Sequence, residues 1–169
     1  MKAVVVVNGK GGVGKDTLCD FVSQKHKTLK VSSIDPIKEM ALFVGWNGEK
    51  TLKARRFLSD LKKATILYND FPTKYLHSKF LSFLKDDYEI MIVQIREAEQ
   101  IIHFIESIQF PAITLLIRGK NEHTYGNTSD DNVDNYSYDF EYFNTLPLEE
   151  AKKDFLSFFE QMITSLSDY

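Results

Sequence analysis

Short apolar runs recur along the chain, and they are rich in the branched and aromatic residues that favour β-strands. Four runs predict strands, at residues 3–7, 29–33, 89–94 and 112–118, and alternating aromatic residues at 137–144 predict a weaker fifth. The runs at 3–7 and 89–94 are almost continuously apolar, which is typical of strands covered on both faces of a parallel sheet.

Segments with a helical spacing of apolar residues lie between these runs. One stripe consists of Ala98, Ile101, Ile102, Ile105 and Ile108, and a later one of Leu148, Ala151, Phe155, Phe158, Phe159 and Met162. Because right-handed crossovers between parallel strands place helices over both faces of a sheet, the alternation predicts an α/β fold. We expect three layers, α/β/α, built on a five-stranded parallel sheet.

The alternation stops between residues 35 and 85, where three helical stripes follow one another without a convincing strand. They are Ile34, Ile37, Met40, Ala41 and Val44, then Phe57, Leu61 and Ala64, then Leu76, Phe80, Phe83 and Leu84. Turn-forming residues at 45–48 and 69–72 separate the stripes. The interval predicts a helical insertion within the α/β core, and the polar segment at about 119–136 predicts a short lid.

Composition bounds the classes of protein to consider. A chain of 169 residues, 43% hydrophobic and 27% charged, suits a single domain over residues 1–169. Its net charge of -3 gives no general attraction for nucleic acid or anionic membrane, and its apolar runs are far shorter than the roughly 20 residues of a membrane span. A signal-peptide pattern is lacking, and the single Cys19 cannot form an internal disulfide. We expect a cytoplasmic monomer or homodimer that binds neither nucleic acid nor membrane.

The strongest chemical signal is a glycine-rich segment directly after the first predicted strand. It reads Gly9, Lys10, Gly11, Gly12, Val13, Gly14, Lys15, Asp16 and Thr17. The spacing is that of a P-loop, in which glycines let backbone N–H groups approach phosphate oxygens. Lys15 supplies a mobile positive charge, and the helix that follows adds the partial charge of its amino terminus. These residues predict a site for the phosphates of ATP.

Two positions depart from the usual P-loop pattern. Asp16 stands where a serine or threonine hydroxyl normally ligates Mg²⁺, and Thr17 follows one residue later. The strand at 89–94 ends in Gln94, where an acidic metal ligand is usual. We expect Asp16 and Thr17 to hold Mg²⁺ directly or through water, although capping of the helix would also explain an aspartate at position 16.

A second set of cations is needed for the acceptor, because phosphoryl transfer depends on aligning two anions and neutralising their charge. Arg55 and Arg56 lie on a predicted helix of the insertion. Since adjacent helical residues point about 100° apart, only one of them is expected to face the acceptor. Both are equally compatible with a solvated face that they share with Lys62 and Lys63.

Arg96 lies just beyond the strand at 89–94, at the edge where open α/β sheets bind ligands. We expect it to act at the acceptor site and in catalysis, and pairing with Glu97 or Glu99 is the alternative. Arg118 ends the next strand, where a cation can contact donor phosphates, stack on adenine, or remain a screened surface charge.

Two further residues are candidates for the acceptor site. Asp35 follows the second predicted strand, where it can bind the acceptor or simply cap the next helix. Trp46 lies in a turn of the insertion, where it can line a pocket for the acceptor base or belong to the core.

The Gly-Lys-Asp-Thr form of the P-loop resembles that of deoxynucleoside monophosphate kinases, including phage-type enzymes. Residues 33–39, 45–50, 55–58, 95–99 and 132–144 resemble segments of that family in the same order, so the likeness spans nearly the whole chain. The resemblance implies an adenylate-kinase-like P-loop NTPase fold whose insertion binds a nucleoside monophosphate. It further implies ATP with Mg²⁺ as phosphoryl donor. We expect Lys15, Asp16 and Arg96 to be the catalytic residues.

Two other functions are compatible with the sequence. The run from Lys10 to Lys15 matches the deviant P-loop of dimeric ATPase switches, although Asp16 and a short chain with an insertion argue against that class. Gln94 and the missing serine or threonine are also compatible with a module that binds nucleotide without transferring phosphate. Acceptors other than nucleotides remain open as well.

Overall fold

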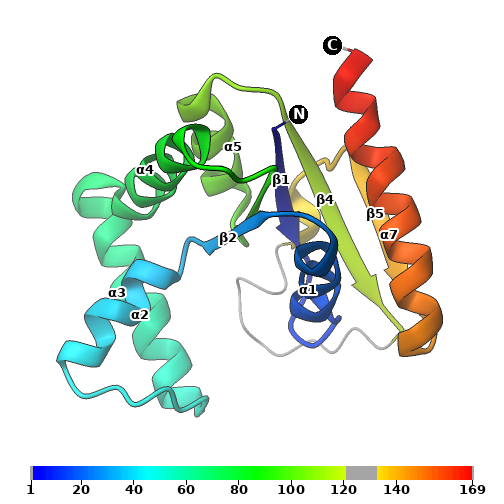
Figure 1. The fold of residues 1–169 in the computed structure, drawn as a ribbon. Helices are drawn as coiled ribbons and strands as arrows, with labels where there is room; N and C mark the ends of the chain where they lie inside the picture. Colours follow the sequence, from blue (N-terminus) through cyan, green and yellow to red (C-terminus); the bar gives the residue numbers. More distant parts are fainter. Residues whose placement is uncertain (1, 121–132, 169) are drawn as a thin grey trace.

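The computed structural model describes residues 2–120 and 133–168, whose arrangement is shown in Figure 1. The elements in chain order are β1 (Ala3–Asn8), α1 (Lys15–Lys25), β2 (Thr28–Ser32), α2 (Asp35–Phe43), α3 (Leu52–Asn69), α4 (Phe71–Lys85), β3 (Ile90–Gln94), α5 (Ala98–Ile108), β4 (Ala112–Gly119), the 3-10 helix η1 (Val133–Asn135), β5 (Phe140–Asn144), α7 (Leu148–Thr164) and the 3-10 helix η2 (Ser165–Asp168).

All five predicted strands are present, and they form one parallel sheet in the order β2-β3-β1-β4-β5. Val7 of β1 pairs with Gln94 of β3, and Gln94 pairs on its other side with Ser32 of β2. The carboxyl ends of these three strands therefore lie next to one another at the same edge of the sheet.

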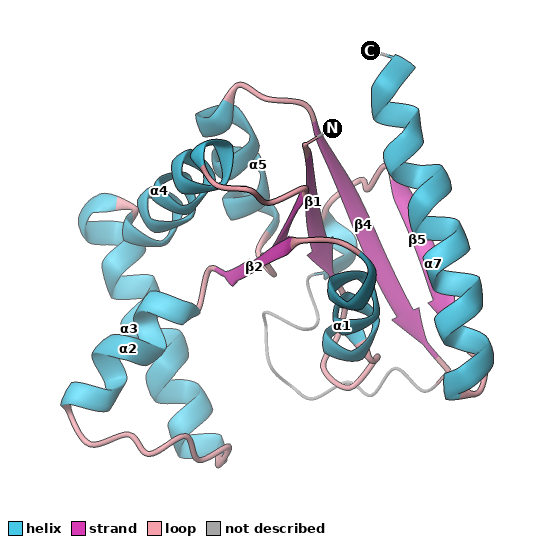
Figure 2. Ribbon diagram, viewed as in Figure 1, coloured by secondary structure: helices cyan, strands magenta, loops and turns pink. Residues whose placement is uncertain are grey.

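Alternate residues of each strand point to opposite faces, and both faces are covered by helices. Val5 and Val7 of β1 belong to the apolar cluster that includes α1 and α7, while Val4 and Val6 belong to the cluster formed with α4 and α5. Figure 2 shows the resulting layers on the two sides of the sheet. The predicted three-layer α/β/α fold is confirmed.

The helical interval between residues 35 and 85 divides into two parts. Leu76, Phe80 and Phe83 of α4 are buried in the cluster that covers one face of the sheet, so α4 is a helix of the core. In Figure 1, α2 and α3 extend away from the sheet beyond β2. Only this helix pair projects from the core in the way expected of an insertion.

The predicted apolar stripe of α3 is not the buried one. Phe57 is 37% exposed and Ala64 is also exposed, whereas Ala54 and Lys62 are the buried residues of the helix. Because α3 packs mainly against α2 and α4, it does not need a broad apolar face.

The polar segment predicted as a lid lies mostly outside the described residues. Its last part is described: Val133 is buried in η1, and the Tyr138 hydroxyl donates a hydrogen bond to the Val133 carbonyl at 2.9 Å. Within residues 2–120 and 133–168, no helix combines the length and apolar character that crossing a membrane requires.

Candidate functional site

The P-loop begins where β1 ends and runs directly into α1. Gly14 precedes the first residue of α1 with a φ of 89°, a left-handed conformation that favours glycine. A Cβ on Gly9 would lie 2.4 Å from the Ile117 carbonyl oxygen, because the loop passes close to β4. Both glycines therefore allow the loop to fold back tightly over the sheet edge.

Lys15 lies over its own loop. Its Nζ donates hydrogen bonds to the carbonyl oxygens of Gly9 at 2.6 Å and Lys10 at 2.9 Å. The ammonium is thus held over the P-loop, where phosphate-binding lysines act.

Asn8 connects the P-loop to two other segments. Its side chain is 1% exposed, and its Oδ1 accepts a hydrogen bond from the Gly9 N–H at 2.8 Å. Its Nδ2 donates to the Arg96 carbonyl oxygen at 2.9 Å and to the Tyr138 hydroxyl at 2.7 Å. One buried amide therefore fixes the start of the P-loop, the segment after β3 and the segment before β5 relative to one another.

The two departures from the P-loop pattern meet in the structure. Gln94 Nε2, at the end of β3, donates a hydrogen bond to Asp16 Oδ1 at 2.9 Å. No hydrogen bond to Asp16 Oδ2 is found within the described part of the chain, and Asp16 and Thr17 are both exposed at the first turn of α1. The side-chain oxygens of Asp16 and Thr17 suit Mg²⁺ as ligands, because this ion is commonly held by one or two protein oxygens while phosphates and water complete its coordination shell.

Arg96 follows β3 and is exposed, and it lies one residue before Glu97. Its backbone is tied to Asn8, so the guanidinium is attached to a segment that borders the P-loop. Arg96 follows β3 and Lys15 begins the helix after β1, and these two strands are neighbours in the sheet, so both residues lie at the same sheet edge.

The two arginines of α3 occupy different environments. Arg56 is 86% exposed and lies 3.9 Å from Asp60, one turn later on the same helix. Arg55 is also exposed, but it lies about 20° around the helix from the buried Lys62, two turns further on. Arg55 therefore occupies the side of α3 that is nearer to the core.

Lys62 also lies at this edge, although one of the two interpretations of the sequence left it on a solvated face. It is 6% exposed, and its Nζ donates to Ser33 Oγ at 2.9 Å and to Glu97 Oε2 at 2.5 Å. The sequence did not predict its burial, because the apolar residues Phe57, Leu61 and Ala64 define a different face of the helix.

Arg118 is engaged by carboxylates at the end of β4. Its guanidinium donates to Asp134 Oδ1 at 2.8 Å and to Glu141 Oε2 at 3.0 Å, and these hydrogen bonds raise the pKa of Arg118 above its ordinary value. Two carboxylates therefore already compensate the charge of Arg118. The assignment of Arg118 to ATP stays a prediction.

Asp35 and Trp46 both make local hydrogen bonds. Asp35 Oδ2 accepts from the Ser32 N–H at 2.7 Å, which satisfies the last residue of β2, and the indole N–H of Trp46 donates to the Glu49 carbonyl at 3.1 Å. Trp46 is half-buried in the connection between α2 and α3. Their proposed contacts with an acceptor stay predictions.

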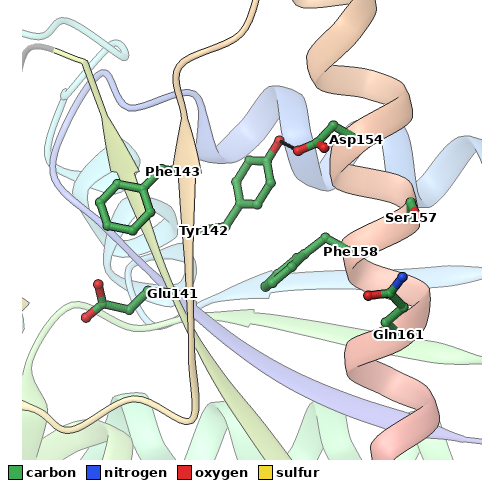
Figure 3. Close-up of a pocket in the computed structure, with 7 residues that line it drawn as sticks. All are labelled: Glu141, Tyr142, Phe143, Asp154, Ser157, Phe158 and Gln161. Carbon is green, nitrogen blue, oxygen red and sulfur yellow. Dashed lines mark hydrogen bonds between the residues drawn. The ribbon is translucent and has the colours of Figure 1, made fainter.

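A separate hollow of about 440 Å³ lies between β5 and α7 (Figure 3). The Tyr142 hydroxyl points across it and hydrogen-bonds Asp154 Oδ2 at 2.9 Å. The lining consists of Glu141, Tyr142, Phe143, Asp154, Ser157, Phe158 and Gln161. Since its charged members are carboxylates, this hollow does not suit a phosphate, and it is formed by elements other than the P-loop.

No protein-family model matches the sequence, and no curated protein matches it. Solved structures do match in shape. A sugar kinase from Janibacter sp. superposes with a TM-score of 0.55 at 13% identity, covering 95% of each chain. A gluconokinase from Sinorhizobium meliloti gives a TM-score of 0.54 at 10% identity, covering 98% of this chain and 95% of the other.

A tunicamycin resistance protein from Deinococcus radiodurans gives a TM-score of 0.55 at 9% identity, covering 93% of this chain and 95% of the other. At such low identity these likenesses speak only to the fold. Together with the glycine-rich loop between β1 and α1 and the five-stranded parallel sheet, they show a P-loop NTPase fold.

Proposed function

We propose that this chain transfers the terminal phosphoryl group of ATP to the phosphate of a nucleoside or deoxynucleoside monophosphate. The observation that carries the proposal is the junction at Asn8, whose amide hydrogen-bonds both the P-loop and the backbone of Arg96. A donor-phosphate loop and a cationic segment suited to a second phosphate are thereby held together at adjoining strand ends, as in-line transfer requires.

On the donor side, Lys15 would exchange the carbonyl oxygens of Gly9 and Lys10 for oxygens of the β- and γ-phosphates. The amino terminus of α1 would add its partial positive charge to the same anion. Asp16 and Thr17 would hold Mg²⁺, which neutralises charge on the phosphates when it is bound.

On the acceptor side, Arg96 and Arg55 would bind the monophosphate. A guanidinium presents paired N–H donors that match two phosphate oxygens, so arginine suits a terminal phosphate better than an uncharged hydroxyl. The two residues come from different elements, the segment after β3 and helix α3, which lets them approach one phosphate from two sides.

The proposal is tested by measuring ADP release with ATP, Mg²⁺ and a panel of ribo- and deoxyribonucleoside monophosphates. We expect one or more acceptors to be phosphorylated, and Lys15→Ala to abolish that activity. Lys153→Ala, which removes an exposed lysine of α7, is the matched control and should leave the rate unchanged. If no monophosphate is turned over faster than with Lys15→Ala, the proposed reaction is wrong.

The same panel separates the alternatives. Gluconate and simple sugars belong in it because two of the structural neighbours bear the names of a gluconokinase and a sugar kinase. Turnover of these compounds alone would replace the nucleotide acceptor with a hydroxyl acceptor. Binding of ATP with no turnover of any compound would indicate a nucleotide-binding module, and ATP-dependent dimerisation that Lys10→Ala abolishes would indicate an ATPase switch.

A further inference from the structure

Lys62 is the only formally charged side chain that is buried among the residues described here. Burying an ammonium group is unfavourable unless it is paired, and Lys62 is paired twice, with the Glu97 carboxylate at 2.5 Å and the Ser33 hydroxyl at 2.9 Å. Replacing such an ion pair by apolar residues often costs little stability, so its presence calls for a purpose other than stability.

Lys62 and its two partners come from three separate segments. Lys62 lies on α3, Ser33 directly follows β2, and Glu97 directly precedes α5. Ser33 is 2% exposed, so the hydrogen bond fixes α3 against the rigid end of the sheet, and Glu97 ties it to the segment after β3. Helix α3, which extends away from the sheet in Figure 1 and also packs against α4, is thereby joined to this edge of the sheet as well.

Each residue of the ion pair lies on the same segment as one of the arginines proposed to bind the acceptor phosphate. Glu97 adjoins Arg96 in the sequence, and Arg55 lies about 10 Å before Lys62 along the same side of α3. The ion pair therefore links the two segments that carry these arginines. The backbone of Arg96 is also hydrogen-bonded to Asn8, the residue before the P-loop.

We propose that the Lys62–Glu97 ion pair is a positioning clamp that sets the spacing of Arg55 and Arg96 for an acceptor phosphate. Lys62 itself does not bind the phosphate, because its charge is already compensated by Glu97 and its ammonium group is almost fully buried. This inference rests on the proposed function and adds to it a residue pair that governs acceptor affinity but not ATP affinity.

The test compares Lys62→Met with Lys63→Met, which removes the neighbouring exposed lysine from the same helix. We expect Lys62→Met to raise the KM for the monophosphate at least tenfold while the Kd for ATP changes less than twofold. Lys62→Arg, which keeps the charge and the pairing, should restore most of the acceptor affinity. Lys63→Met should match the wild type in both the KM for the monophosphate and the Kd for ATP.

Hydrogen exchange gives a readout that needs no acceptor. Loss of the clamp should speed exchange at amides of α3 in Lys62→Met but not in Lys63→Met. The clamp is refuted if Lys62→Met leaves either the acceptor KM or the exchange of α3 unchanged, or if it weakens ATP as much as the acceptor. If the wild type phosphorylates no monophosphate, the proposed function fails first, and the role given to Lys62 fails with it.

Discussion

The side-chain amide of Gln94 donates a hydrogen bond to Asp16 across 2.9 Å, joining the end of β3 to the first turn of α1. In the usual P-loop arrangement a carboxylate stands at the strand position and a hydroxyl at the loop position. Here the carboxylate is on the loop and the neutral partner is on the strand. The carboxylate has therefore moved from the strand position to the loop position, so this pair of positions still carries one carboxylate.

Gln94→Asp should turn this contact into a repulsion that Mg²⁺ relieves. Two unit charges about 4 Å apart in water interact by about 1 kcal/mol, which should lower the melting temperature by about 2–4 °C at low salt. Millimolar Mg²⁺ should restore it, because the ion can bind between the two carboxylates. Thermal unfolding with and without Mg²⁺ measures both effects.

Gln94→Asn is the matched control, since it keeps an uncharged amide at the same position. Its melting temperature should not respond to Mg²⁺ more than that of the wild type. Equal melting of Gln94→Asp with and without Mg²⁺ would show that position 94 does not face Asp16 in solution.

Gly14→Ala should destabilise the protein for two separable reasons. The backbone at Gly14 has a φ of 89°, and a new Cβ would lie 2.5 Å from Nδ2 of Asn144, which donates to the Val13 carbonyl at 2.9 Å. Strain and overpacking together should cost about 2–4 kcal/mol, measured by urea unfolding.

Gly45 separates the two effects, because it has a φ of 93° but no atom within 4 Å of the place that a Cβ would occupy. Gly45→Ala should therefore report the strain alone and cost less than Gly14→Ala. Combining Gly14→Ala with Asn144→Ala should cost less than the sum of the single changes, since the overlap is gone. Strict additivity would place the Asn144 amide away from the P-loop.

The sheet could be predicted from the sequence because each strand carries its own signal. The run from Val4 to Val7 is fully buried, and continuous apolar runs of this kind are typical of strands in the middle of a parallel sheet covered on both faces. The P-loop was likewise evident, because its spacing is local and its strand and helix context is short-range.

Contacts between distant segments could not be predicted in this way. In α5 the expected stripe included Ile102, which is 45% exposed, and omitted Phe104, which is fully buried, because packing against α4 selects the inner face. The burial of Lys62 was missed for the same reason, since its partners lie 29 and 35 residues away. A lysine is predicted to be exposed unless a partner is known.

Cys19 should be inert in the folded protein and should make stability fall at alkaline pH. Burial raises the pKa of its thiol from 9.0 to about 12, with the Asp16 charge adding to the shift. Between these values the unfolded chain releases the thiol proton while the folded chain keeps it, so the free energy of unfolding decreases as pH rises.

Urea unfolding at several values between pH 8 and about pH 11 should therefore show a shallower decline for Cys19→Ala than for the wild type. A thiol reagent at neutral pH should label the wild type only as fast as the chain unfolds. Rapid labelling under native conditions would show that the thiol is accessible and would remove the basis for the pH effect.

Lys2 should stabilise the fold by capping carbonyl groups at the carboxyl terminus of α4. Its Nζ donates to the carbonyl oxygens of Phe83, Asp86 and Tyr88, each at 2.7 Å, and lies 4.5 Å from the centre of the Phe83 ring. Carbonyl groups at a helix carboxyl terminus lack partners within the helix and carry partial negative charge, so one ammonium satisfies several at once.

Lys2→Met keeps the length and apolar stem of the side chain but leaves these carbonyls to water, which should cost about 2 kcal/mol and lower the melting temperature by about 4–8 °C. Lys85→Met is the matched control, because it removes an exposed lysine from the last turn of the same helix. Its effect should stay within about 0.5 kcal/mol. Equal losses in the two variants would mean that general attraction to the helix terminus, and not the three hydrogen bonds, accounts for the contribution of Lys2.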